Sequence, residues 1–128
     1  DIPEANHGNT VVVQFALPAI AQSASCTLDS SSIEQTAEYK EKEKKVVWRL
    51  KKFQGGTEHT LNTRITLSKE SAGNVRKTLG PISMVFEVPM FNSTGLQIRY
   101  LRQADAKGAT PCRWVRYLTQ SSSYVCRL

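Results

Sequence analysis

The chain has 128 residues, which is the size of one domain and too small for two well-separated ones. It contains no apolar run near the length of a membrane span and no signal-peptide pattern at its start, so we expect a globular protein of the cytoplasm. Its formal net charge of +6 is unevenly placed along the sequence. Cys26, Cys112 and Cys126 lack CxxC spacing, and we interpret them as three small buried apolar residues in a reduced chain, not as disulfide or zinc ligands.

The pattern of apolar residues predicts β-strands along most of the chain and an all-β fold, an antiparallel β-sandwich. Apolar and polar side chains alternate over Thr10–Leu17, Val46–Phe53, Glu58–Leu67, Ile82–Val88 and Leu96–Gln103. Ile33–Lys45 has helical composition, with Glu and Lys four residues apart, but we interpret it as extended. Loops are predicted at the stretches rich in Ser, Gly, Lys and Asp, which are Asp29–Ser32, Ser68–Pro81 and Ala104–Pro111.

Gly55-Gly56 predicts a two-residue hairpin turn, because glycine readily supplies the positive φ that such a turn needs. That turn would place Leu50 opposite Leu61 and Val46 opposite Ile65. The apolar faces of the two strands coincide in this register, and a slip of one residue would turn one apolar set toward water.

The positive charge is concentrated between Tyr39 and Lys52, where seven cations stand against Glu41 and Glu43. One interpretation is a solvated strand edge, where lysines block pairing with another sheet. The other is a surface that meets anionic lipid headgroups. Nucleic acid is not indicated, because no matching motif accompanies the charge. The seven cations are Lys40, Lys42, Lys44, Lys45, Arg49, Lys51 and Lys52.

The C-terminal segment, 111–128, predicts two short strands joined by a polar turn at 120–122. The predicted strands are Cys112–Thr119 and Ser123–Leu128. Side chains on a strand alternate, so Trp114, Arg116 and Leu118 point one way and Val115 and Tyr117 the other. An arginine two residues from a tryptophan indicates an exposed face that can grip an aromatic ring by stacking and cation–π contact.

No enzyme activity is indicated by the sequence. His7 and His59 are the only histidines, and neither lies in a known catalytic motif. His59 follows the predicted glycine turn, where an exposed histidine is expected. No metal-ligand spacing or phosphate-binding loop is present, so no cofactor is predicted.

Four runs closely resemble one family. GPISMVFEVPM (80–90), GLQIRYL (95–101) and RWVRYL (113–118) resemble the C-terminal end of adaptor medium (mu) chains, the cargo-reading subunits of vesicle-coat adaptor complexes. VWRLKKFQGG (47–56) resembles the middle hairpin of the same family, and the similarity covers nearly the whole chain in order. GGTEHTL (55–61) and the C-terminal end look most like mu chains of the fourth adaptor complex.

The resemblance implies an elongated two-subdomain mu-homology domain, with residues 1–89 in the second subdomain and 90–128 in strands that return to the first. Such domains bind Tyr-x-x-Φ sorting signals in extended form along a strand edge. Trp114 and Arg116 match the positions that flank the signal's tyrosine ring. Ile98, Leu101 and Val115 match those that line the pocket for the bulky apolar residue. A further aromatic and a carboxylate of the tyrosine pocket come from an early strand that this sequence does not contain.

The implied partners are the cytosolic tails of transmembrane cargo and the other adaptor subunits, on trans-Golgi, endosomal or coated-vesicle membranes. The alternative is a basic interaction module that docks on an anionic membrane or on coat subunits without reading tyrosine signals. Lys40 and Arg49 match cationic positions that contact phosphoinositide in the endocytic relative, but Thr36 and Glu38 stand where that relative has lysines. Because strands from Leu96 to Leu128 would lack their partners, self-association is also expected.

Overall fold

The computed structural model describes residues 2–29, 33–68, 78–104, 108 and 112–127. Its strand pairings are all antiparallel, which confirms the predicted all-β antiparallel fold. No helix in these ranges is long and apolar enough to cross a membrane. The elements are β1 (His7–Ala16), β2 (Ala21–Leu28), β3 (Gln35–Lys40), the 3-10 helix η1 (Glu41–Glu43), β4 (Lys45–Leu50), β5 (Phe53–Gln54), β6 (Leu61–Leu67), β7 (Ile82–Pro89) and β8 (Leu118–Cys126).

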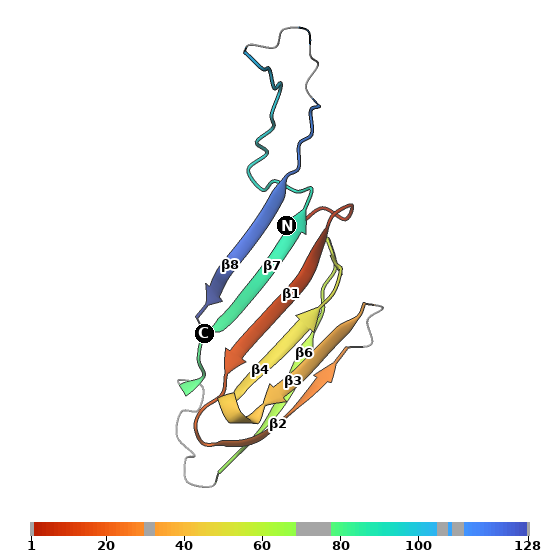
Figure 1. Ribbon diagram of the computed structural model, residues 1–128. Helices are drawn as coiled ribbons and strands as arrows, with labels where there is room; N and C mark the ends of the chain where they lie inside the picture. Colours follow the sequence, from red (N-terminus) through yellow and green to blue (C-terminus); the bar gives the residue numbers. More distant parts are fainter. Residues whose placement is uncertain (1, 30–32, 69–77, 105–107, 109–111, 128) are drawn as a thin grey trace.

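The larger sheet has the strand order β3-β4-β1-β7-β8, and β5 pairs with the start of β1 (Figure 1). β1 lies in the middle, between β4 and β7, which explains its valine-rich sequence. β1 and β7 confirm the strands predicted at Thr10–Leu17 and Ile82–Val88. Thr10 adopts a φ of 43° where the register between β1 and β7 shifts, so the strand is bulged at this point.

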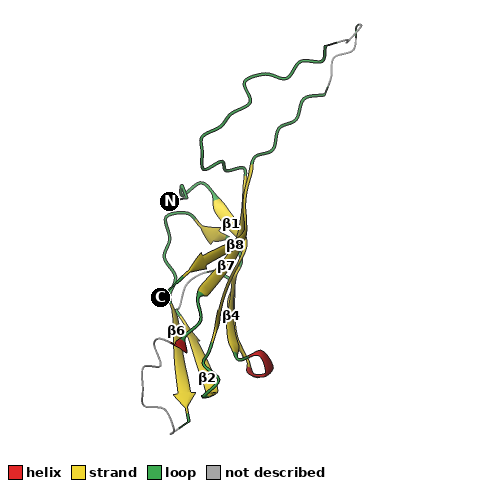
Figure 2. Cartoon of the chain, turned by 90° about the vertical axis from the view of Figure 1, so that its left-hand side faces the viewer, coloured by secondary structure: helices red, strands yellow, loops and turns green. Residues whose placement is uncertain are grey.

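The smaller sheet consists of β2 and β6 and packs against one end of the larger sheet (Figure 2). Leu17, Ala21 and Val46 form the buried centre of the core between the two layers. Beyond that core, an apolar cavity of about 200 Å³ opens on the larger sheet. The residues lining it are Ile2, Gly8, Val11, Phe53, Met84, Phe86 and Val88.

The turn at Gly55-Gly56 does not form the predicted hairpin. β4 ends at Leu50, β5 pairs with β1, and β6 pairs with β2 in the other sheet. The predicted partners Leu50–Leu61 and Val46–Ile65 are therefore wrong as ladder pairs. Ile65 instead packs against the cluster that contains Val46, so these apolar faces meet across the two layers. A local turn signal cannot distinguish a hairpin from a connection between layers.

Two segments next to β3 in the chain also differ in part from the predicted strands. The extended interpretation of Ile33–Lys45 is confirmed over Gln35–Lys40, and the lysine- and glutamate-rich remainder forms the turn of η1. β2 was not predicted, because Ala21–Leu28 consists mostly of small and polar residues. Its alternate residues Ala24 and Cys26 nevertheless pack on the core. Their small side chains give a weak periodic signal, and pairing with β6 determines the structure there.

The prediction of a C-terminal hairpin is also wrong. β8 continues as one strand through the predicted turn at 120–122 and pairs with β7 on both sides of a register shift, which lies between the pairs Phe86–Ser121 and Met84–Tyr124. The row of backbone groups on β7 supplies partners for β8, and this tertiary pairing overrides the turn preference of the serines. Neither Leu96–Gln103 nor 112–117 is assigned as strand.

The prediction that the three cysteines are buried holds in part, for one of them. Cys26 is half-buried against the core, but Cys112 and Cys126 are exposed, so the prediction of burial is wrong for both. All three thiols are free. Cys126 is exposed because β8 lies at the edge of the larger sheet.

Candidate functional site

The arm, which we define as residues 90–117, leaves the larger sheet between β7 and β8. Figure 1 shows two extended lengths that rise side by side from the ends of these strands. At the base, the Met90 amide donates to the Tyr117 carbonyl at 2.8 Å, and the Thr119 hydroxyl donates to the Phe91 carbonyl at 2.8 Å. These bonds join the two lengths where they enter the sheet.

The second length carries Trp114 and Arg116 on one face, as predicted. Trp114 is 77% exposed and Arg116 and Leu118 are also exposed, whereas Val115 and Tyr117 are half-buried. The alternation continues into β8, although 112–117 has no ladder partner among the described residues. Trp114 is therefore not a core residue of this chain.

Arg116 makes an ion pair that the sequence did not indicate. Its Nη2 lies 3.8 Å from Oε1 of Glu87, which belongs to β7. Both side chains are well exposed, so the pair contributes little stability. The ladder pairs Glu87 with Gln120, so Arg116 reaches Glu87 from four residues before that pair, and no spacing in the sequence indicates this contact.

The first length carries Ile98 and Leu101, which are 55% and 54% exposed. The Ile98 amide donates to the hydroxyl of Tyr117 at 2.9 Å, which ties this length to the one that bears Trp114. Leu101 lies three residues farther along, and no described contact joins it to Trp114 or Val115. The predicted grouping of Ile98, Leu101 and Val115 stays a prediction.

Exposed apolar side chains are concentrated in and beside the arm. All the large ones among the described residues lie between 85 and 125, whereas the buried core residues lie between 11 and 88. An apolar surface of this kind marks an interaction site. Its members are Val85, Met90, Leu96, Ile98, Tyr100, Leu101, Trp114, Leu118, Tyr124 and Val125.

The basic stretch forms a different surface, at the turn between β3 and β4. Lys40 and Arg49 both pair with Glu38, at 3.9 and 3.0 Å. Lys45 pairs with Glu43, and this hydrogen bond lowers the pKa of the Glu43 carboxyl.

Lys44 and Lys42 differ from these paired cations. The ammonium of Lys44 donates to the carbonyls of Ala19 and Ala21, the latter at 3.2 Å. Lys42 is exposed and makes no ion pair with the described residues. Much of the local charge is thus balanced within the fold. Within the described ranges, no cluster of three or more His, Cys, Asp or Glu could hold a metal ion.

Comparison with known proteins gives one consistent family. The adaptor complexes medium subunit family matches residues 1–128. The chain is 45% identical over 121 residues to the AP-4 complex subunit mu of Arabidopsis thaliana, covering 94% of this chain and 27% of that protein. It is 33% identical over 124 residues to the AP-1 complex subunit mu-1-I of Caenorhabditis elegans, with the same coverage. It is 32% identical over 119 residues to the AP-2 complex subunit mu of Dictyostelium discoideum, covering 91% of this chain and 26% of that protein. The chain thus spans about a quarter of the length of these relatives.

Proposed function

Because the chain belongs to the adaptor complexes medium subunit family, we propose that it is part of a cargo-recognition module that binds Tyr-x-x-Φ sorting signals. The observation that carries this proposal is the exposed pair of Trp114 and Arg116 on one face of the arm. A tryptophan face and a guanidinium can hold a tyrosine ring between them by stacking and cation–π attraction.

The backbone of the arm supports the same proposal. Residues 112–117 are extended and lack a ladder partner among the described residues, so they can pair with an added peptide strand. In this arrangement Trp114 and Arg116 flank the tyrosine of the signal. Ile98, Leu101 and Val115 supply the apolar contacts for its bulky residue.

This function assigns partners and a location to the protein. The ligands are cytosolic tails of transmembrane cargo, and the protein works with other adaptor subunits at trans-Golgi, endosomal or coated-vesicle membranes. The remaining aromatic and carboxylate of the tyrosine pocket belong to the part of the relatives that this chain does not span. The protein acts by binding and not as an enzyme.

The direct test is a calorimetric titration of the intact protein with a Tyr-x-x-Φ peptide and with its Tyr→Ala counterpart. Saturable binding of the first peptide, with loss of binding for the second, is the expected result. Equal affinity for both peptides would contradict tyrosine recognition.

Attachment to an anionic membrane is a second proposed activity, because Lys42 is exposed in the turn between β3 and β4 and makes no ion pair with the residues that the structure describes. We expect Lys42→Glu to weaken binding to phosphatidylserine vesicles, since each cation near such a surface contributes about 1 kcal/mol. Vesicle co-sedimentation at low and high salt measures the effect, with Lys51→Glu as control, because Lys51 is already paired with Glu34 at 2.6 Å. If Lys42→Glu and Lys51→Glu co-sediment equally with the vesicles, the basic stretch is a solvated strand edge and not a membrane-binding surface.

Self-association is the third proposal, because β8 is the edge of the larger sheet and the arm beside it is apolar and exposed. We expect the isolated chain to dimerise as its concentration rises. Light scattering over a dilution series measures this, and a constant monomer mass would contradict it.

A further inference from the structure

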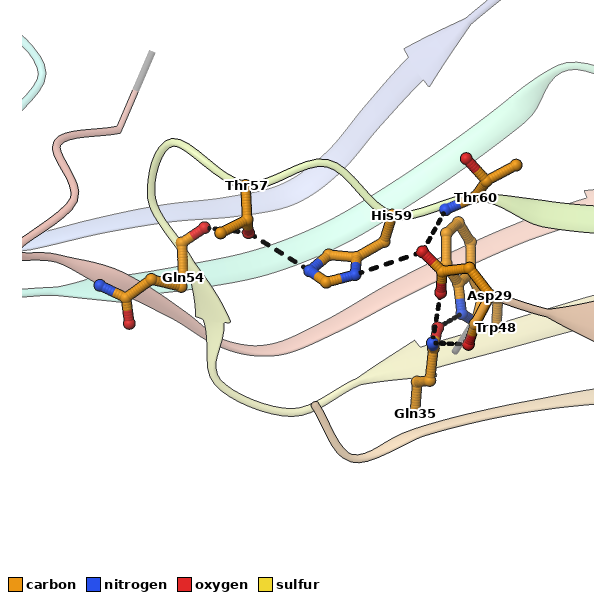
Figure 3. A network of polar contacts seen from close by, with 7 residues as sticks. All are labelled: Asp29, Gln35, Trp48, Gln54, Thr57, His59 and Thr60. Atoms are coloured by element: carbon orange, nitrogen blue, oxygen red, sulfur yellow. Dashed lines mark hydrogen bonds and ion pairs between the residues drawn. The ribbon is translucent and has the colours of Figure 1, made fainter. Parts of the chain in front are cut away.

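The side chain of His59 is buried, contrary to the sequence-based expectation of an exposed turn histidine. Only 6% of its side chain is exposed, because the segment after β5 folds back onto the end of β2. The ring of Phe53 packs edge-on against the imidazole, with centroids 4.8 Å apart. Figure 3 shows the polar groups around the ring.

The hydroxyl of Thr57 determines which imidazole nitrogen carries the proton. Thr57 Oγ1 lies 2.6 Å from the Gln54 carbonyl, and because a carbonyl only accepts, the single hydroxyl proton is donated there. The contact of 3.2 Å between Thr57 Oγ1 and His59 Nε2 therefore has Nε2–H as the donor. A neutral His59 then carries a lone pair, and no proton, on Nδ1.

That lone pair faces a carboxylate. Among the described residues Nδ1 has no hydrogen-bond partner, and it lies 3.7 Å from Oδ2 of Asp29. Asp29 is held in place, because its Oδ1 accepts from Gln35 Nε2 at 2.7 Å and its Oδ2 accepts from the Thr60 amide at 3.3 Å. Gln35 is in turn held by the indole N–H of Trp48 at 3.1 Å. With a neutral ring, two hydrogen-bond acceptors, Nδ1 and the Asp29 carboxylate oxygen, therefore face each other. A proton on Nδ1 would turn this nitrogen into a donor to Asp29.

The other groups packed here leave Asp29 as the charged partner of the ring. β5 contributes Phe53, and β3 and β4 contribute Gln35 and Trp48 to the same network, none of which titrates near neutral pH. Glu58, next to His59 in the chain, is exposed. Two charged side chains beside the network, Glu34 and Lys51, are paired with each other.

We propose that His59 and Asp29 form a proton-operated lock, in which a proton taken up at Nδ1 closes an ion pair that fastens the segment 55–60 to the end of β2. The lock joins the two layers, because Asp29 follows β2 of the smaller sheet and Gln35 and Trp48 belong to the larger one. The ion pair exists only with a proton on Nδ1, so we expect a stabilisation that is present in mild acid and is lost as the pH rises.

The test compares thermal unfolding of the protein and of His59→Gln between pH 5.5 and pH 8. We expect the melting temperature of the unmodified chain to exceed that of His59→Gln by at least about 3 °C more at pH 5.5 than at pH 8. In an Asp29→Asn background this pH dependence should disappear. Long-range nitrogen NMR of the unmodified chain reads the protonation of Nδ1 directly, with His7 as the internal reference, and does not depend on the folding of any variant.

The sign of the effect decides between the lock and simple burial. A histidine that is merely buried would make the unmodified chain lose its advantage over His59→Gln in acid. Either that result, or an Nδ1 that stays unprotonated at pH 5.5, would overturn the proposal. A pH dependence that persists in Asp29→Asn would assign it to another group.

Discussion

Trp114→Ala in the intact protein is expected to weaken binding of a Tyr-x-x-Φ peptide by about 1 to 3 kcal/mol, or roughly 5- to 150-fold. The same range is expected for Arg116→Ala. Truncation removes the flat surface or the cation that grips the tyrosine ring, and aromatic and arginine anchors carry most of the energy at peptide interfaces. Calorimetric titration of each variant measures the loss.

Folding should respond differently from binding. Trp114 is 77% exposed, and the ion pair of Arg116 with Glu87 is long and open to solvent, so neither truncation removes core packing. We expect the free energy of unfolding to change by less than about 0.5 kcal/mol in each variant. Tyr100→Ala is a matched control, because Tyr100 is an 81% exposed aromatic on the same arm and matches no pocket position.

Three outcomes would contradict the assignment of this site. Equal peptide affinity in the unmodified protein and the Trp114→Ala/Arg116→Ala double variant would remove the proposed pocket. A large loss of thermal stability in Arg116→Ala would give this residue a structural role. An equal loss of affinity in Tyr100→Ala would indicate a general apolar surface without a tyrosine pocket.

The predicted strands and the structure agree where one strand's own pattern decides the outcome. Alternation correctly predicted β1 and β7 as strands, and it placed Trp114 and Arg116 on one exposed face. Which strands pair depends on residues far apart in the sequence, and here the local turn signals gave wrong predictions. Gly55-Gly56 joins the two layers instead of two neighbouring strands, and β8 continues through its serines because β7 provides a ladder.

The same distinction explains what was missed at the arm and at His59. Contacts such as Arg116 with Glu87 and Ile98 with Tyr117 join residues 19 or more positions apart. His59 is buried because Asp29 and Phe53 meet it from other elements, although its sequence neighbours Glu58 and Thr60 are polar and exposed. Sequence periodicity carries no information about such contacts until the strand order is known.

The largest loss of stability is expected from Leu50→Ala. Leu50 is 1% exposed at the end of β4, opposite Val11 of β1 on one side and Gln35 of β3 on the other. Removing a buried leucine side chain to alanine costs about 2 to 5 kcal/mol, because the lost transfer free energy adds to the cost of the cavity. In a chain with few fully buried side chains, a loss of that size approaches the whole stability of a small domain. Urea unfolding measures it as a shift of the midpoint.

Leu96→Ala is the control, because the chemistry is identical and Leu96 is 69% exposed on the arm. We expect its free energy of unfolding to stay within about 0.5 kcal/mol of that of the unmodified chain. A small loss for Leu50→Ala would mean that β4 does not lie between β1 and β3. A large loss for Leu96→Ala would mean that the arm packs onto the sheet in solution and does not stand free. The pair of substitutions therefore tests both the strand order of the larger sheet and the exposure of the arm on which the proposed binding site depends.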